Sequence, residues 1–459
     1  MLERILVIGL DSADPELVFD RFAGRLPNLD RLSERSRWGR LRSIDPPITV
    51  PAWASMMSGQ DAGRLGIYGF RNRAGYGYDQ LAIANSLSIR QPQLWDLLGA
   101  AGLDSIVVGA PPGYPARPLR GCRVGCFLTP KTPSQPWTYP AELAHELDEA
   151  VGGYETDVAE FRTDDREPLL GDIFRLSDKQ FRAAAHLART RPWQFLILVN
   201  IAVDRMHHGF WRYFDSEHRK HEPGNRFASA MLEFYQSVDR SVGELLELAD
   251  ERTAVLVVSD HGAKRIDGGV CINDWLIRQG YLTLEEYPDQ PTSLAKLKVN
   301  WRKTRAWGEG GYYGRVFVNL QGREPEGQVP RAQYEQFRDE LAAGLAAIPD
   351  DQGRPMATRV LKPQELYQEV NGIPPDLLVY FGDLHWRSIG SVGYRAVHTL
   401  DNDSGPDDAN HALEGLYILS APGVEPTPNR PQHLLQIAPT LLKLLGQPIP
   451  SDMRRPPFV

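Results

Sequence analysis

Short runs of consecutive apolar residues recur along the chain and alternate with helix-like patterns. Residues 4–10 (RILVIGL) are rich in β-branched side chains, which is typical of a strand buried on both faces. Similar runs occupy residues 105–109, 195–200, 254–259, 377–381 and 415–419. Amphipathic patterns lie between them, at residues 28–35, 93–101, 173–189, 227–249, 331–347 and 433–445. This alternation predicts an α/β fold with three layers, in which helices cover both faces of a mostly parallel central sheet.

The segment from about residue 262 to residue 409 differs from the rest of the chain. It is rich in Gly, Pro and Trp, has weaker periodicity, and contains a predicted strand at residues 315–320. A length of 459 residues is compatible with one large domain or with two or three ordinary ones. We predict a single domain over residues 1–459, with residues 262–409 as a cap region inserted within it.

Composition and charge narrow the classes of partner. Hydrophobic residues make up 42% of the chain and charged residues 24%, which is typical of a folded, soluble protein. The net charge of -8 argues against binding to a nucleic-acid polymer, which requires clustered basic residues. An anionic small molecule stays compatible with this charge, because bound divalent cations reverse the local field.

The three cysteines, Cys122, Cys126 and Cys271, are too few and too scattered for a disulfide framework, which indicates a reducing compartment. The Cys122 and Cys126 pair has no second Cys or His pair nearby, so we interpret it as structural. The N-terminus lacks the features of a signal peptide, and no apolar run approaches the roughly 20 residues of a membrane span. We therefore expect a cytoplasmic protein with no membrane association.

Acidic residues and histidines follow three of the predicted strands. The carboxyl ends of parallel strands meet at one edge of a sheet, so these side chains are expected to lie together. Each has an ordinary alternative, as a helix cap, a surface pair or a loop residue, and the joint pattern is more specific than its members. The set comprises Asp11, Asp204, His208, Asp260 and His261, with His411 as a further candidate.

Carboxylates and imidazoles together suit divalent metal ions, with zinc expected first and manganese or iron as alternatives. Two such ions about 3.5–4 Å apart can clamp both oxygens of a phosphoryl displacement. Thr49 is a candidate nucleophile, because Pro51 marks the start of a predicted helix whose N-terminus favours an anion. An N-cap role for Thr49 is the alternative on local sequence alone.

The chain resembles the alkaline phosphatase superfamily, and most closely its type I phosphodiesterase/nucleotide pyrophosphatase branch. The motifs that carry the resemblance are LDSAD, TVPAWASMMSG, VDRMHHG, SDHG and NHALEG, and the resemblance runs from about residue 4 to residue 424. The resemblance implies two metal sites and a phospho-enzyme intermediate on Thr49 that water then hydrolyses. One site would comprise Asp11, Thr49, Asp260 and His261, and the other Asp204, His208 and His411, with the family spacing selecting His208 over His207.

Several positions depart from that branch. Phe70 stands where the branch carries an asparagine that binds a phosphate oxygen, and Asn72 lies close by but out of register. The branch's His-Gly stretch reads Arg64-Leu65-Gly66-Ile67 here. For an arginine that grips a terminal phosphate, the candidates are Arg71, Arg73 and Arg205. The departures leave the metal chemistry better supported than nucleotide specificity.

Two further segments bear on the substrate. The stretch from residue 309 to residue 314 (EGGYYG) either borders the substrate pocket, with Tyr312 and Tyr313 stacking on a ring, or forms a hairpin or bulged strand in the cap. The acidic residues 401–408 (DNDSGPDD) resemble the start of a calcium loop but lack its distal Glu. We interpret them as a turn that positions His411.

The sequence thus favours a hydrolase of phosphodiester or nucleotide-type pyrophosphate bonds in small molecules. A phosphomonoesterase and a phosphonate hydrolase are alternatives on the same core. A phosphomutase usually carries Ser as its nucleophile, and a sulfatase carries a modified Cys or Ser, so Thr49 argues against both. A catalytically inactive binding protein is the alternative outside the enzymes. The oligomeric state stays open.

Overall fold

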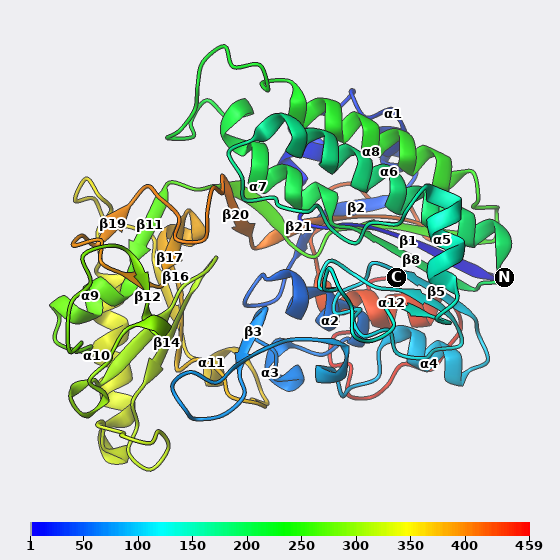
Figure 1. Ribbon diagram of the computed structural model, residues 1–459. Coiled ribbons are helices and arrows are strands. Elements are labelled where there is room, and N and C mark those ends of the chain that lie inside the picture. The colour runs from blue at the N-terminus through cyan, green and yellow to red at the C-terminus, as the bar shows by residue number, and fades with distance from the viewer. Residues whose placement is uncertain (1) are drawn as a thin grey trace.

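The computed structural model describes residues 2–459, and a nine-stranded sheet forms its centre (Figure 1). Only β21 and β7 run antiparallel to their neighbours, which confirms the predicted mostly parallel sheet. The strands follow the order β22 (Gln432–His433), β2 (Arg37–Arg42), β21 (Glu414–Ser420), β9 (Thr253–Val258), β1 (Arg4–Leu10), β8 (Phe195–Asn200), β5 (Ser105–Val108), β6 (Gly121–Val124) and β7 (Thr138–Tyr139).

Helices cover both faces of this sheet because successive side chains of each strand point to opposite sides. Leu6 and Ile8 of β1 pack in one core and Ile5 and Val7 in the other. The first core is covered by α1 (Pro27–Glu34), α5 (Leu143–Val151), α6 (Arg166–Thr190), α7 (Ala202–Phe214) and α8 (Ala230–Leu246). The second is covered by α2 (Thr49–Ser58), α3 (Ala62–Leu65), α4 (Leu94–Ala100) and α12 (Ile437–Leu444).

A smaller lobe extends from one end of the central sheet and lies on the left in Figure 1. Its chain enters and leaves through β10 (Gly262–Arg265) and β20 (Ala409–Ala412), which pair with each other. The lobe has its own hydrophobic core, which includes Trp307, Phe317 and Phe337. Its elements include β11 (Gly268–Cys271), α9 (Ile272–Arg278), β13 (Ala306–Glu309), β14 (Gly314–Val318), α10 (Tyr334–Ala346), β15 (Arg359–Leu361), α11 (Pro363–Leu366), β16 (Leu377–Tyr380), β17 (Trp386–Ile389) and β19 (His398–Thr399). That this segment works as a cap stays a prediction.

The apolar run at residues 377–381 belongs to the lobe rather than to the central sheet. It forms β16, which pairs antiparallel with β14 and β15. Leu377 and Val379 pack in the lobe core, whereas Leu378 and Tyr380 pack in a separate cluster on the other face. Burial on both faces produces the same apolar run in either sheet, so the run alone could not assign the strand to one of them.

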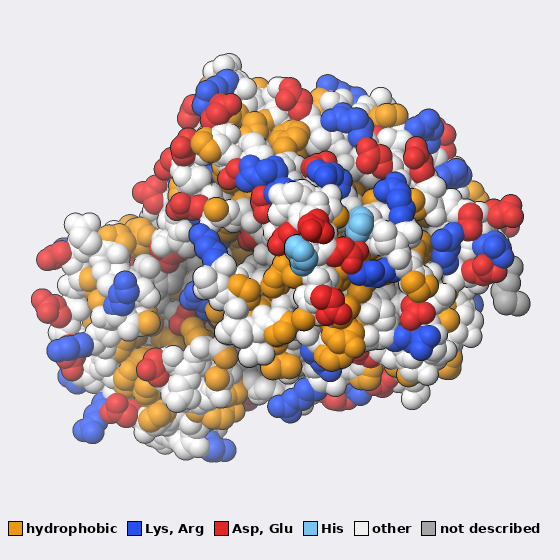
Figure 2. Space-filling view, turned by 45° about the vertical axis from the view of Figure 1, so that its right-hand side comes forward, with side chains coloured by type: hydrophobic (Ala, Val, Ile, Leu, Met, Phe, Trp, Pro, Cys, Tyr) orange, Lys and Arg blue, Asp and Glu red, His pale blue; other side chains and the backbone are white. Residues whose placement is uncertain are grey.

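The face in Figure 2 is hollowed between the small lobe and the main body, and acidic and basic side chains are intermingled over it. Among residues 2–459, no helix combines the length and the apolar character of a membrane span. Cys122, Cys126 and Cys271 are free thiols and all are buried.

Candidate metal centre and adjoining pocket

The predicted acids and histidines meet at one edge of the central sheet. The pairing register sets the ends of β1, β8 and β9 together, because Leu10 pairs with Asn200 and Gly9 with Val258. Asp11 comes directly after the end of β1 and Asp260 two residues after the end of β9, and both are fully buried. Asp204 lies in the first turn of α7, after the third strand.

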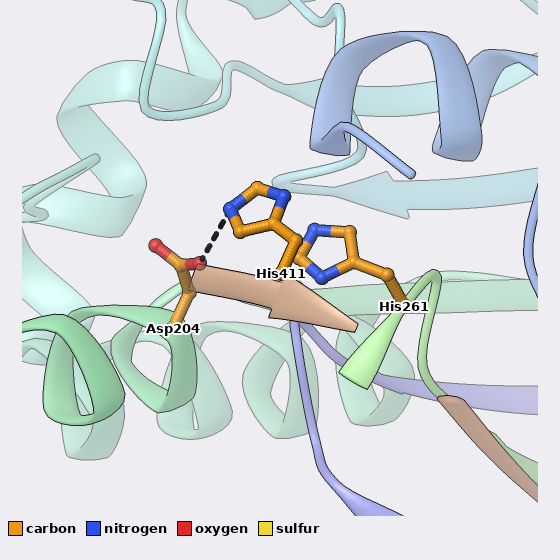
Figure 3. Close-up of side chains that lie close together, drawn as sticks. All are labelled: Asp204, His261 and His411. Atoms are coloured by element: carbon orange, nitrogen blue, oxygen red, sulfur yellow. Dashed lines mark ion pairs between the residues drawn. The ribbon is translucent and has the colours of Figure 1, made fainter. Parts of the chain in front are cut away.

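His411 joins this group through the pairing of β20 with β10, which sets it opposite Ala263, two residues after His261. The rings of His261 and His411 stack with centroids 3.8 Å apart (Figure 3). Figure 3 shows Asp204 extending from α7 towards His411, whose Nε2 lies 3.9 Å from Asp204 Oδ1. Sequence-distant residues thus become neighbours through strand pairing.

The ligand atoms form two overlapping groups. Asp11, Asp260 and His261 offer atoms that all lie within 4.8 Å of one another, and so do Asp204, His261 and His411. His208 adds to the second group, because its Nε2 lies 3.2 Å from Asp204 Oδ1. His261 belongs to both groups.

Acceptors outside the cluster orient the imidazoles. His261 Nδ1 lies 3.0 Å from the carbonyl oxygen of Gly262, and His411 Nδ1 lies 2.8 Å from that of Pro47. His208 Nδ1 lies 2.7 Å from Asp407 Oδ1. An acceptor at Nδ1 holds the proton there and leaves the Nε2 lone pair free to bind a metal ion. All three Nε2 atoms therefore face the cluster.

His207 is oriented differently. Its Nδ1 lies 3.3 Å from Ser12 Oγ and its Nε2 2.9 Å from the hydroxyl oxygen of Tyr235. Both ring nitrogens are thus engaged in the core beneath the cluster. The structure places His208, and not His207, beside Asp204, as the spacing of the motif predicts.

The buried carboxylates of Asp11 and Asp260 have oxygens that could bind cations. Among the described residues, no hydrogen-bond donor reaches Asp11 Oδ1 or Asp260 Oδ2. Burial raises the pKa of Asp11 well above its usual range, and the charge of Asp204 raises it further. Burial and the charge of Asp11 do the same to the pKa of Asp260. Bound divalent cations would offset this repulsion, so the donor set fits metal ions.

The histidines fit the same interpretation. Burial lowers the pKa of His261 to about 4, and burial together with His261 lowers that of His411 well below its usual value. Both rings are therefore neutral at pH 7, which is the form that binds metal. Burial would also lower the pKa of His208, but the charge of Asp407 outweighs it and raises that pKa.

Thr49 lies at the N-terminus of α2, as predicted, and its side chain is buried. Its Oγ1 is 3.3 Å from His261 Nε2, which places the hydroxyl at the cluster. The same helix carries Trp53, whose Nε1 donates to Asp11 Oδ2 at 2.8 Å. Gly9 makes this contact fit, because a Cβ at Gly9 would lie 2.6 Å from the Trp53 ring.

A pocket of about 460 Å³ lies next to the cluster. Ile48 and Arg205 line it, and each directly adjoins a candidate site residue in the sequence. Tyr312 lines it as well and stacks on His411, with ring centroids 4.2 Å apart. Basic and aromatic side chains form most of the wall, namely Arg71, Arg162, Arg205, Arg315, Arg387, Phe70, Phe127, Phe161, Tyr312 and Tyr313.

The predicted substrate residues are placed unequally around this pocket. Phe70, Tyr312 and Tyr313 line it, and the tyrosines lie on the connection between β13 and β14, so the hairpin and the pocket border are the same segment. Asn72 lines a different pocket, and its amide group bonds to Tyr68 N and Gly69 O within a turn. The polar atoms of Asn72 are therefore hydrogen-bonded within a turn rather than directed into the pocket beside the cluster.

The candidate arginines also differ in their position relative to the pocket. Arg71 and Arg205 line the pocket, whereas Arg73 is buried in an ion pair with Glu324 at 3.0 Å. Arg205 is held by Asp157 and by Asp204 Oδ2, each at 2.7 Å. Sequence reasoning missed Arg162 and Arg387, because they come from a loop and from a lobe strand with no motif around them.

The acidic turn at residues 401–408 has a different partner from the expected one. Asp407 contacts His208, whereas the carbonyl oxygen of Pro47 orients the His411 ring and Asn410 Oδ1 accepts from the His411 backbone N–H. The turn does position a candidate ligand, but not His411. Which histidine it reaches depends on the packing of α7 beneath the turn, and the sequence gives no information on that packing.

Comparisons with known proteins give the family of the chain and structures that share its fold. The family model described as type I phosphodiesterase / nucleotide pyrophosphatase matches residues 5–407. No curated protein matches the chain. Phosphonoacetate hydrolase from Sinorhizobium meliloti 1021, solved with phosphonoacetate, shares 19% identity and a TM-score of 0.60 over 97% of this chain and 96% of that one. Human ectonucleotide pyrophosphatase/phosphodiesterase 5 shares 13% identity and a TM-score of 0.54 over the same fractions.

Proposed function

Since the chain belongs to the type I phosphodiesterase/nucleotide pyrophosphatase family, within the alkaline phosphatase superfamily, we propose that it hydrolyses phosphodiester or nucleotide-type pyrophosphate bonds of small molecules through Thr49. The observation that carries the proposal is the position of the Thr49 hydroxyl. It lies at a helix N-terminus, 3.3 Å from His261 Nε2 and beside carboxylate oxygens that lack donors. A nucleophile next to cation ligands is the arrangement that phosphoryl transfer requires.

Two divalent cations complete the proposed site, with zinc first and manganese or iron as alternatives. Asp11, Thr49, Asp260 and His261 would hold one ion, and Asp204, His208 and His411 the other. When bound, the ions lower the pKa of the Thr49 hydroxyl and stabilise the charge that develops on the phosphoryl oxygens.

The residues of the chain have separate roles in the proposed reaction. Thr49 Oγ gives up its proton to solvent and attacks phosphorus, the bond from phosphorus to the leaving oxygen breaks, and that oxygen takes a proton from water. A water molecule next attacks the phosphothreonine, its oxygen joins phosphorus, the bond from phosphorus to Thr49 Oγ breaks, and a proton from the attacking water restores the Thr49 hydroxyl. The N-terminus of α2 favours the anionic states of Thr49 and of the phosphoryl group. Arg205, fixed by Asp157 and Asp204, faces the same pocket.

A phosphonate hydrolase is the second candidate, and the composition of the pocket wall favours it. Five arginines line the pocket, and Phe70 stands where the branch has its phosphate-binding asparagine. Clustered guanidinium groups suit a compact substrate with a second anionic group, such as a carboxylate. The neighbour solved with phosphonoacetate shares the fold at 19% identity, which makes this substrate a natural probe.

Thr49→Ala, with Thr49→Ser as its matched control, tests the proposal. The zinc- or manganese-loaded proteins are assayed on bis-p-nitrophenyl phosphate, p-nitrophenyl phosphate and phosphonoacetate. We expect the diester to turn over faster than the monoester, and Thr49→Ala to lose a factor of about 10³ or more in kcat. Thr49→Ser should keep part of the activity, and acid-quenched protein should carry a phosphoryl group on residue 49.

The substrate that is hydrolysed decides between the candidates. Preference for phosphonoacetate replaces the first candidate by the second, and preference for the monoester indicates a phosphatase. If no substrate turns over, or if Thr49→Ala matches the wild type, the proposed mechanism is wrong.

A further inference from the structure

The side chain of Asp407 is fully buried beside the candidate metal cluster, on the loop that leads into β20, and its carboxylate has three partners. Asp407 Oδ1 accepts from His208 Nδ1 at 2.7 Å. Asp407 Oδ2 accepts from Arg387 at 2.5 Å and from Arg162 at 3.3 Å. One carboxylate therefore joins a candidate metal ligand to two arginines of the pocket wall.

These partners come from three separate parts of the fold. His208 lies on α7 of the main body, Arg387 lies on β17 of the lobe, and Arg162 lies in the connection before α6. The backbone N–H of Asp408 also donates to the carbonyl oxygen of His208 at 2.9 Å, so the loop holds α7 at two points. No other carboxylate among the described residues contacts both arginines.

The two arginines form one side of the pocket with Tyr312. Arg162 donates to the Tyr312 hydroxyl at 3.1 Å, and the Arg387 guanidinium lies over the Tyr312 ring at 4.7 Å. Tyr312 in turn stacks on His208 and His411, with centroids 5.0 and 4.2 Å away. Without the charge of Asp407, the two guanidinium groups would repel each other and lose their shared acceptor.

We propose that Asp407 is a positioning residue that orients His208 for its metal ion and fixes Arg162 and Arg387 in the pocket wall, so that metal affinity and substrate binding depend on one carboxylate. A carboxylate at Nδ1 fixes the ring orientation and makes the Nε2 lone pair more basic. The second oxygen holds the arginines in a charge-assisted contact. The effect on substrate binding rests on the proposed function, whereas the effect on metal affinity does not.

Asp407→Asn tests the proposal, with Asp401→Asn as the matched control. Asp401 lies in the same loop, but its side chain is 85% exposed and its ion pair with Lys220 spans 3.5 Å. Bound metal is counted by mass spectrometry of the holoprotein after dialysis, and affinity is measured by competition with a chromophoric chelator. We expect Asp407→Asn to bind one of the two ions about 10- to 100-fold more weakly and Asp401→Asn to match the wild type.

Arg162→Ala separates the two effects. The Arg162 side chain is 27% exposed, so the fold is expected to tolerate its removal. This variant should raise KM several-fold and leave both metal affinities unchanged, whereas Asp407→Asn should change both. If Asp407→Asn does not fold, as judged by circular dichroism, Asp407→Glu replaces it and should weaken the same ion by displacing the carboxylate.

Metal affinity tests the role of Asp407 independently of the proposed activity. If the Asp407 variant that folds binds two ions with wild-type affinity, the inference is overturned, whatever the protein hydrolyses. If Asp407→Asn weakens one ion but KM stays unchanged on every hydrolysed substrate, the coupling to the pocket is overturned. If nothing is hydrolysed while one ion is weakened, the proposed function fails and the positioning of His208 stands.

Discussion

The candidate metal cluster and the pocket beside it are held in different ways. Asp11, Asp260 and His261 follow the ends of adjacent parallel strands and are fully buried, so the central sheet fixes their geometry. The pocket wall draws instead on a hairpin connection with Tyr312 and Tyr313, and on Arg387 of a lobe strand. A sheet edge can therefore keep one chemistry while the inserted lobe changes the molecule that reaches it.

The largest expected effect lies at the sheet edge, where Asp11→Asn removes a charge without changing the side-chain volume. We expect metal affinity to fall and kcat/KM to drop by a factor of about 10³ or more, because the ligands act as a unit. The metal-free protein should be at least as stable as the wild type, since burial raises the pKa of this carboxyl. The metal-induced rise in Tm should be lost.

Calorimetric melts with and without zinc measure both effects of Asp11→Asn. Asp20→Asn is the control, because Asp20 is 64% exposed on the body surface. Trp53→Phe gives a graded comparison: it removes the hydrogen bond to Asp11 together with part of a buried ring, and we expect about a tenfold loss of metal affinity. If Asp11→Asn retains the metal-induced rise in Tm, Asp11 is not a ligand.

A smaller effect is expected in the pocket wall. Tyr312→Ala removes the ring that stacks on His411, and aromatic stacking of this kind contributes about 0.5–1.5 kcal/mol. We expect KM to rise about two- to tenfold, with a smaller change in kcat. Tyr312→Phe keeps the ring but loses the hydrogen bond from Arg162, so its KM should lie between those of the wild type and Tyr312→Ala. Tyr313→Ala should also raise KM, and unchanged steady-state kinetics in both Ala variants would remove this hairpin from the substrate site.

The last expected effect is on stability rather than on catalysis and concerns the junction between the two regions, where His218 holds the loop after Asp407. His218 Nε2 donates to the carbonyl oxygen of Asp408 at 3.1 Å, and Nδ1 accepts from Lys220 N at 3.0 Å. Burial lowers the pKa of His218 to about 4, below its usual value of 6.5. Between these values the unfolded chain binds more protons than the folded one, so stability falls as pH decreases from 6.5 to 4.

His218→Gln should therefore show a shallower loss of unfolding free energy over this pH window. The expected difference in slope is at most about 1.4 kcal/mol per pH unit. Urea titrations of both metal-free proteins at pH 7, 6, 5 and 4.5 measure it. Parallel slopes for the variant and the wild type would mean that His218 is protonated equally in both states.

Much of the site could be predicted because strand ends are encoded locally. An apolar run that ends in an acid gives both the strand and the edge to which its next residue belongs, as with Asp11 and Asp260. The run at residues 377–381 could not be assigned in the same way, because burial on both faces looks alike in the central sheet and in the lobe. The pairing of Asn72 with turn atoms also required the folded backbone.

The sequence by itself determined the α/β architecture, the family and the residues that gather at the sheet edge. These follow from periodicity and from motifs of adjacent residues, which act over short stretches of chain. Only the tertiary structure decided that Asp407 reaches His208, that Arg162 and Arg387 share its other oxygen, and that five arginines line one pocket. Such contacts join segments up to hundreds of residues apart, and packing of the lobe against the body fixes them.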